Sequence, residues 1–497
     1  MHDFVIRNAL LLDGLGSAPV HGDLAVKDGK ISEVGKSLSG KELIDASGLA
    51  LMPGIIDNHT HYDAQITWDP LVSPSPALGV TTAIIGNCGF TIAPCRPADR
   101  ELVMKNLTQV EGMSLEVLRQ GIRWEFETIP QYFDMLERRG TAINIAGFVG
   151  HSSLRTYVMG EDAPRRAAAR DEVARMRALL FEGMRAGAIG FATSTSPAHN
   201  GHGGLPMPSR LADDAEMREL VGALKEAGRG VFMLTKGGHT KMPFLEELAA
   251  ASGRPVVIAA LLHNSTNPRA VFDDLEAIAA ANARGRRLVG AISCCPLSMD
   301  FTLHSPYTFE GLESWQPALP LKGAAYEAKL KDRGFRDAVR AELQRPAHFR
   351  LFNALLLNSD EQAVGEMLRH PASLVSLSDA GAHLTFFNDA GFGLHLLGHW
   401  VRERGALELD DAVRRLTSAP AQLFGIRGRG VLKPGYAADL MLFDPAAVGR
   451  GAKQRVFDLP GGHPRLTTPA LGVHGVWVNG VRHLESLPGK VLRDFSA

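Results

Sequence analysis

The feature that most constrains this fold is an alternation of short apolar runs with helical runs along the middle of the chain. Helical segments such as 216–227 and 274–281 separate the apolar runs. Repeated strand–helix units of this kind predict a parallel sheet, and eight of them predict an α/β fold of the (β/α)8 TIM barrel type. The eight predicted strands are 49–56, 81–85, 142–149, 188–192, 230–234, 256–262, 288–293 and 374–378.

Both termini have a different pattern, with short β signals and turns but few helical runs. Residues 24–35 form a hairpin signature around Asp28-Gly29, and similar short strands recur at 430–445 and 473–480. We therefore expect a discontinuous small β-sandwich domain formed by both termini, although two unrelated β units would give the same pattern. The expected domains are the β-sandwich, 1–53 plus 425–497, and the barrel, 54–424, with an insertion around 299–350.

Composition excludes several classes of partner. The 497 residues include 53 Lys and Arg against 54 Asp and Glu, so nothing favours nucleic acid or an anionic membrane. No apolar run is long enough to span a membrane, and no signal peptide is visible, so we expect a cytoplasmic protein. The four cysteines are too few for a disulfide framework, and we expect them to be reduced.

Polar and reactive residues stand at the ends of several predicted strands. In barrels of this type the active site lies at the carboxyl ends of the strands, so these side chains should meet in one site. The residues in question are His59, His61, Cys88, His151, Thr235, Lys236, His263 and Asp379.

The pair His59-Thr-His61 follows the first apolar strand. Alternate residues of a strand point to the same side, so two imidazoles converge where a divalent metal could lie, unless they are merely surface histidines. Asp379 closes the last strand and could bind the metal and take a proton from bound water, or could simply cap a turn. Cys88 could provide a thiolate ligand or be a buried structural thiol.

Taken together, these and other motifs resemble the amidohydrolase superfamily and, more narrowly, its N-acyl-D-amino-acid deacylase (D-aminoacylase) branch. The resemblance covers about residues 4–480. The matching pieces are His59-Thr-His61-Tyr-Asp, Trp68-Asp69-Pro70, Gly79-Val-Thr-Thr with Gly-Asn-Cys88-Gly, Gly150-His151-Ser-Ser-Leu154-Arg155, Ala186-Gly-Ala-Ile-Gly190-Phe, Ser378-Asp379 and Lys433-Pro-Gly with Ala438-Asp439-Leu.

This resemblance implies metal-dependent hydrolysis of the amide bond of an N-acyl amino acid, such as an N-acyl-D-amino acid, or of a related small amide. His59, His61, Cys88 and Asp379 match positions around the metals, usually one or two zinc ions, and Asp379 matches the general acid and base. The alternatives are a hydrolase of a cyclic amide, lactam or lactone on the same scaffold, or a non-catalytic barrel that has lost metal ligands.

The chain departs from this branch at the fifth and sixth strands, where the deacylases carry histidines that bind the tighter metal. Thr235 or Lys236 takes the first of these positions and Ala260 the second. Lys236 could be a carbamylated metal ligand, a strand-end lysine or a carboxylate contact. His263 comes three residues late and reaches the metal only if its strand is extended or bulged. The number of metals, one or two, stays open.

Four further residues are candidates for substrate binding: His151, His202, Arg210 and His383. His151 could equally make a structural hydrogen bond, Arg210 could cap a helix beside its glycine-rich loop, and His383 could belong to the core. The insertion 299–350 could cover the mouth of the barrel or form an oligomer contact. We expect a small-molecule substrate and a homo-oligomer.

Overall fold

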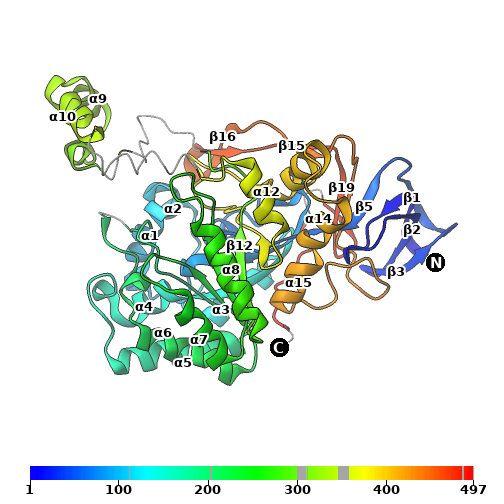
Figure 1. Cartoon of the computed structure of the whole chain (residues 1–497), viewed down its shortest axis with the longest axis horizontal. Coiled ribbons are helices and arrows are strands. Elements are labelled where there is room, and N and C mark those ends of the chain that lie inside the picture. The colour runs from blue at the N-terminus through cyan, green and yellow to red at the C-terminus, as the bar shows by residue number, and fades with distance from the viewer. Residues whose placement is uncertain are drawn as a thin grey trace.

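Figure 1 shows the chain as a barrel with a sheet at one side, in a computed structural model that describes residues 1–110, 112–201, 204–298, 309, 312–344, 357–483 and 486–495. Eight parallel strands form the barrel sheet in chain order. The predicted barrel is therefore confirmed. Its strands are β6 (Ile55–Asp57), β7 (Val80–Ile85), β8 (Asn144–Gly150), β9 (Gly190–Ser194), β10 (Val231–Thr235), β11 (Val256–Leu261), β12 (Leu288–Ile292) and β13 (Ser373–Val375).

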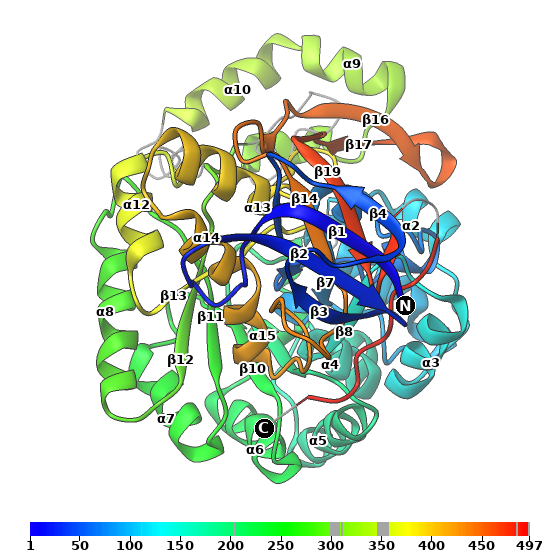
Figure 2. The same cartoon turned by 90° about the vertical axis from the view of Figure 1, so that its right-hand side faces the viewer.

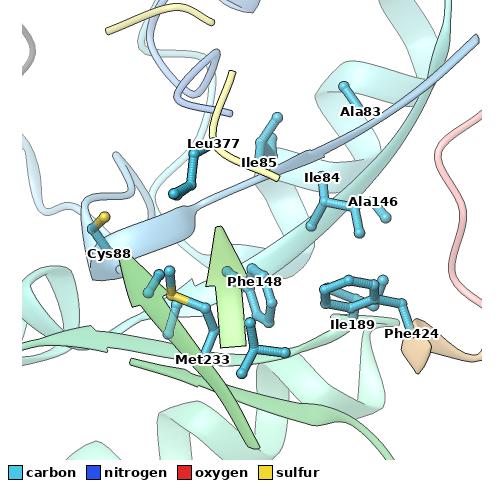
Figure 3. Packing of buried hydrophobic residues seen from close by; sticks show 14 of the residues in the cluster. Ala83, Ile84, Ile85, Cys88, Ala146, Phe148, Ile189, Met233, Leu377 and Phe424 are labelled. Carbon is cyan, nitrogen blue, oxygen red and sulfur yellow. The ribbon is translucent and has the colours of Figure 1, made fainter. Parts of the chain in front are cut away.

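The barrel strands are buried nearly along their whole length. β7 and β8 have no exposed residue, as expected for parallel strands that are covered by helices on one side and by the barrel interior on the other. Figure 3 shows side chains from different strands, among them Ile85, Phe148 and Met233, packed together. The interior is thus a filled apolar core that leaves chemistry to the strand ends.

The first predicted strand, 49–56, is in fact two strands that belong to two sheets. Ala50–Pro53 forms β5 of the terminal sheet, and the barrel strand β6 begins only at Ile55. Gly54 stands at the break. A Cβ at this position would lie 2.1 Å from the Thr81 side chain, so only glycine allows the chain to pass so close to β7.

The barrel closes where the first and last strands meet. Thr60 and Ala380 form a parallel bridge, and the His61 N–H donates to the Ala380 carbonyl over 2.7 Å. The Asp379 N–H donates to the carbonyl of His59 at 3.2 Å. This seam places the backbone of the His-x-His motif directly beside Asp379.

Helices cover the outside of the barrel. The predicted segments 216–227 and 274–281 lie within α6 and α8, and Asp213 caps α6 by accepting from the Glu216 N–H. The helices are α1 (Arg100–Val110), α2 (Leu115–Gly121), α3 (Ile129–Arg139), α4 (His151–Met159), α5 (Arg170–Arg185), α6 (Asp214–Ala227), α7 (Met242–Ser252), α8 (Ala270–Ala283), α9 (Gly323–Lys331), α10 (Arg333–Leu343), α12 (Glu361–Arg369), α13 (Phe392–His395), the π-helix η11 (Leu396–Glu403), α14 (Leu409–Leu416) and α15 (Ser418–Phe424).

Strands from the two termini share one mixed sheet, which lies in front of the barrel in Figure 2. Its apolar core includes Phe4, Leu24 and Trp477. We propose the division into 1–53 plus 425–497 and 54–424 on this basis. The strands of this sheet are β1 (His2–Leu11), β2 (Val20–Lys27), β3 (Lys30–Gly35), β4 (Gly40–Asp45), β5 (Ala50–Pro53), β14 (Leu440–Phe443), β19 (Val473–Val478) and β20 (Val481–Arg482).

Part of the C-terminal segment packs on the barrel loops instead of joining this sheet. β15 (Gly449–Arg450) pairs with β18 (Ala470–Leu471), and β16 (Gln454–Leu459) pairs with β17 (His463–Thr467). The Leu466 N–H donates to the Leu384 carbonyl, and Arg465 donates to the Ser73 carbonyl. This hairpin therefore contacts the loops that follow the first and last barrel strands.

In the predicted insertion, the described helices α9 and α10 lie apart from the barrel in Figure 1 and have a small apolar core of their own around Trp315 and Phe335. Residues 299–308, 310–311 and 345–350 of this insertion lie outside the described residues. Within the described part of the chain, no helix is both long and apolar enough to cross a membrane.

Candidate metal centre

The two histidines of the His-x-His motif lie just beyond β6 with their rings facing one carboxylate. The Nε2 atoms of His59 and His61 are 3.3 and 3.6 Å from Oδ1 of Asp379. The ring centroids are 5.3 Å apart, and both side chains are buried. Three potential ligand atoms, the Nε2 atoms of His59 and His61 and Oδ1 of Asp379, thus meet where the first and last strands of the barrel are joined.

Cys88 contributes a fourth atom from the turn after β7, and its side chain is drawn near the end of that ribbon in Figure 3. Its Sγ lies 3.5 Å from Nε2 of His59 and 4.0 Å from Nε2 of His61. Its φ of 58° is uncommon for a residue other than glycine, a strain typical of functional positions. Among the described residues, only His59, His61 and Cys88 form a group of possible metal ligands within 4.8 Å of one another.

The Asp379 loop approaches the His-x-His motif unusually closely. Asp379 itself has a φ of 47°. Gly381, at φ 92°, lies so near to His61 that a Cβ there would be 2.6 Å from the His61 carbonyl. A side chain at residue 381 would push the loop outward, so glycine at this position lets Asp379 reach both imidazoles.

Burial and mutual charge set the protonation of this group. Burial lowers the pKa of His59 to about 3, so its imidazole is neutral and can bind a metal at neutral pH. Burial would raise the pKa of Asp379, but the hydrogen bond to His61 and the nearby histidines outweigh it and hold that pKa well below its usual range. Burial raises the pKa of the Cys88 thiol. A bound cation would favour the thiolate.

The predicted ligands of the fifth and sixth strands are not part of this group. Lys236 donates from Nζ to Asp274, 2.8 Å away at the closest, so its amine forms an ion pair away from the cluster. The ring of His263 is buried against Phe272, and its Nδ1 has no hydrogen-bond partner among the described residues. The structure therefore does not bring Lys236 or His263 into the group of His59, His61 and Cys88, and their role as metal ligands stays a prediction.

Thr235 and Ala260 occupy the strand ends in their place. The Oγ1 of Thr235 lies 3.1 Å from the Cys88 sulfur, whereas Ala260 is exposed and has no atom that could bind a metal. Thr235 is among the strand-end residues expected from the sequence, but hydroxyl groups are common, and only the folded barrel shows its proximity to the thiol.

His151 does not match the predicted substrate contact, because both of its ring nitrogens are engaged inside the protein. Nδ1 is 2.8 Å from the Thr193 hydroxyl, and Nε2 is 2.8 Å from the Glu216 carboxylate, which also accepts from the buried Arg155. Burial lowers the pKa of His151, and Glu216 opposes the shift. These buried hydrogen bonds of His151 connect α4 with β9 and α6.

Of the other three residues predicted to bind substrate, one lies beside the candidate metal centre, one is bonded within its own loop, and one lies outside the described residues. Arg210 does not match the prediction, because its guanidinium donates to the His199 carbonyl and to Asn200 in its own loop. His383 packs against the rings of Phe386 and Phe387, and its charge acts on His59 and Asp379, so it lies beside the cluster. His202 lies outside the described residues.

One histidine beside the cluster has no signal in the strand-end pattern. His199 lies in the loop after β9, with its ring 4.9 Å from that of Phe90, which in turn lies 6.4 Å from the His61 ring. It comes five residues after the strand ends, in a loop where sequence alone does not indicate which histidine points inward.

Comparison with known proteins agrees with this geometry. The sequence pattern of the Amidohydrolase family matches residues 42–307 and 247–482. The chain is 30% identical to an N-acyl-D-aspartate deacylase of Alcaligenes xylosoxydans xylosoxydans, covering 96% of this chain and 91% of the relative. It is 31% identical to a D-aminoacylase of the same organism, covering 96% and 93%.

Solved structures show the same similarity. An N-acyl-D-glutamate deacylase from Bordetella bronchiseptica, in complex with zinc and a phosphonate that mimics the tetrahedral intermediate, has a TM-score of 0.74 and 26% identity, covering 99% of this chain and 100% of that one. A D-aminoacylase structure has a TM-score of 0.73 and 27% identity, with the same coverage. The family match and these relatives, which cover nearly all of this chain, show that the chain belongs to the amidohydrolase family.

Proposed function

We propose that this protein hydrolyses the amide bond of N-acyl-D-amino acids with a single zinc ion. The observation that carries the proposal is the convergence of two imidazole nitrogens, a thiol and a carboxylate at the barrel seam. The substrate class comes from the relatives, which are deacylases of N-acyl-D-aspartate, N-acyl-D-glutamate and related compounds.

The residues at the cluster fit zinc. Zinc binds histidine nitrogen, cysteine sulfur and carboxylate oxygen, usually with four ligands. His59, His61 and Cys88 are buried, and their ligand atoms lie within 4.8 Å of one another, which is close enough for one ion to contact all three. His59, His61 and Cys88 would hold the metal and leave a position open for water, and Asp379, beside both imidazoles, would be a weaker ligand.

Zinc held by these residues would lower the pKa of a water molecule and would supply positive charge to the reaction. Asp379 accepts the proton of the attacking water, since its low pKa keeps it ionised, and then returns the proton to the leaving amine. His59 and His61 hold the carboxylate in position on one side, and the seam between Thr60 and Ala380 keeps the two strands in register.

Support for one metal, rather than two, comes from the opposite strand ends. A D-aminoacylase structure has been described with a binuclear metal centre. In this chain Thr235 and Ala260 stand at the ends of β10 and β11, and the Lys236 amine is paired with Asp274. A second ion near Cys88 would therefore find few ligands among the described residues.

The test combines metal analysis with a substrate panel. We expect one zinc per chain, and hydrolysis of N-acyl-D-amino acids in preference to their L-isomers and to cyclic amides, lactams or lactones. Cys88→Ser should weaken zinc binding by at least about 10- to 100-fold, the cost of losing even a residue that supports a ligand. Cys95→Ser, which changes a buried thiol outside the cluster, should not. Two zinc ions per chain, or activity on cyclic substrates alone, would contradict the proposal.

We also propose that the protein acts in the cytoplasm as a homo-oligomer. The balanced charge and the sparse, buried cysteines support the location, and the separate α9–α10 unit provides a surface for self-association. Fractionation of cells and light scattering of the purified protein test the two statements. A monomer in solution would contradict the second.

A further inference from the structure

His199 lies close to the candidate metal centre but is not one of its possible metal ligands. Its ring stands edge-on to that of Phe90, and the Phe90 ring is in turn stacked with that of His61. Burial and the nearby His383 and His61 lower the pKa of His199, whereas Asp379 raises it, so His199 lies within electrostatic range of the candidate metal centre. Part of its surface remains accessible.

The loop holds the His199 backbone in place through three hydrogen bonds. Its carbonyl accepts from the Arg210 guanidinium at 3.0 Å and from the Met207 N–H at 3.2 Å. Its own N–H donates to the Ser196 carbonyl at 3.1 Å. A loop residue with so many backbone contacts has a defined position, which a group that must meet a substrate requires. Arg210 therefore serves the site indirectly, by holding His199.

Ser194, the last residue of β9, determines which ring nitrogen carries the proton. Its hydroxyl lies 2.6 Å from Nδ1 of His199 and accepts from the Ser196 N–H at 3.1 Å. Among the described residues, Nδ1 is the only acceptor available to the Ser194 hydroxyl. The hydroxyl therefore donates to Nδ1, and the neutral imidazole carries its hydrogen on Nε2.

Burial keeps this imidazole neutral by lowering the pKa of His199 to about 3. The Nε2–H then points away from Ser194, and no described residue accepts from it. In enzymes that stabilise an oxyanion, neutral N–H donors are placed where negative charge develops on an oxygen.

We propose that His199 donates a hydrogen bond from Nε2 to the oxygen of the scissile acyl group, and that Ser194 is the positioning residue that sets its tautomer. The inference rests on the proposed amide hydrolysis. Attack on the acyl carbon moves negative charge to this oxygen, so the hydrogen bond strengthens in the transition state more than in the bound substrate.

The experiment compares His199→Phe, which keeps a ring but removes the donor, with His199→Gln, which keeps an N–H donor. We expect His199→Phe to lower kcat about 100- to 1,000-fold, the usual cost of losing one such donor, with KM changed less than about threefold. The affinity for a phosphonate analogue of the N-acyl-D-amino acid should fall by a similar factor. His199→Gln should recover part of both losses, and zinc content should stay at the wild-type value.

His21→Phe, in the exposed part of β2, is the matched control and should leave kcat unchanged. Loss confined to KM, kcat within about threefold of the wild type, or loss of zinc from both His199 variants would each overturn the inference. An inactive wild type would contradict the proposed function instead, and the phosphonate affinities of the wild type and the variants would still report on His199. Ser194→Ala should lower kcat with zinc retained, and an unchanged kcat would remove Ser194 from the argument.

Discussion

The two sides of the barrel mouth carry similar residue types, but their side chains converge on one side and point to separate partners on the other. On the ligand side, at the ends of β6, β7 and β13, side chains converge until their ligand atoms lie within 4.8 Å. On the opposite side, at the ends of β10 and β11, Lys236 turns to Asp274 and His263 packs against Phe272. A strand-end histidine or lysine therefore becomes part of a site only if the backbone directs it inward.

The register of each strand explains this difference. His59 and His61 are two residues apart, so one strand direction presents both rings to Asp379 across the seam. His263 comes two residues after β11 ends, and Asn358 accepts from its backbone N–H while its own ring is buried elsewhere. One or two residues of displacement are enough to remove a side chain from the site.

The strongest test of the ligand side is Asp379→Asn. The amide keeps the shape of the carboxylate but cannot take a proton, so we expect turnover to fall about 100- to 10,000-fold, the usual contribution of a general acid–base group. Zinc content should remain largely intact, because His59, His61 and Cys88 are unchanged. Steady-state rates and metal analysis of the same preparation measure both. Undiminished turnover would exclude Asp379 from the chemistry.

The side of the barrel mouth at the ends of β10 and β11 can be tested by introducing metal-binding histidines there. In the double variant Thr235→His and Ala260→His, an imidazole replaces the hydroxyl that lies 3.1 Å from the Cys88 sulfur, and a second one projects from the neighbouring strand. We expect zinc to rise from one ion per chain to two, measured by elemental analysis after dialysis. The control with valine at both positions should keep one ion. A count of one in the histidine variant would show that the backbone of this side cannot form a site.

The smallest effect is expected for Lys236→Met. Its ion pair with Asp274 is about one-fifth exposed on each side, so its removal should cost about 1 kcal/mol or less of unfolding free energy. Turnover and zinc content should change less than about twofold, and Asp274→Asn should give the same small loss of stability. A marked loss of zinc in the lysine variant alone would mean that Lys236 reaches the metal after all.

Much of the fold could be predicted because residues that are buried in the fold are mostly apolar in the sequence. Strands covered on both faces read as continuous apolar runs, and the predicted 81–85, 230–234 and 288–293 each agree with a barrel strand to within one residue at either end. The first strand differed most from its prediction, which began six residues before the barrel strand does. The run 49–56 is apolar throughout, and only the contact of Gly54 with Thr81 shows where one sheet ends and the other begins.

By itself, the sequence determined the family, the eight-stranded barrel and the identity of the residues at the first, second and last strand ends, because motif spacing and apolar periodicity are local properties. Only the tertiary structure decided which of those residues meet. Asp379 lies beside His59 because the barrel closes at Thr60 and Ala380, and His199 lies against Phe90 because Arg210 holds its backbone and Ser194 its ring. Such contacts join residues up to some 320 positions apart, a separation over which sequence periodicity carries no information.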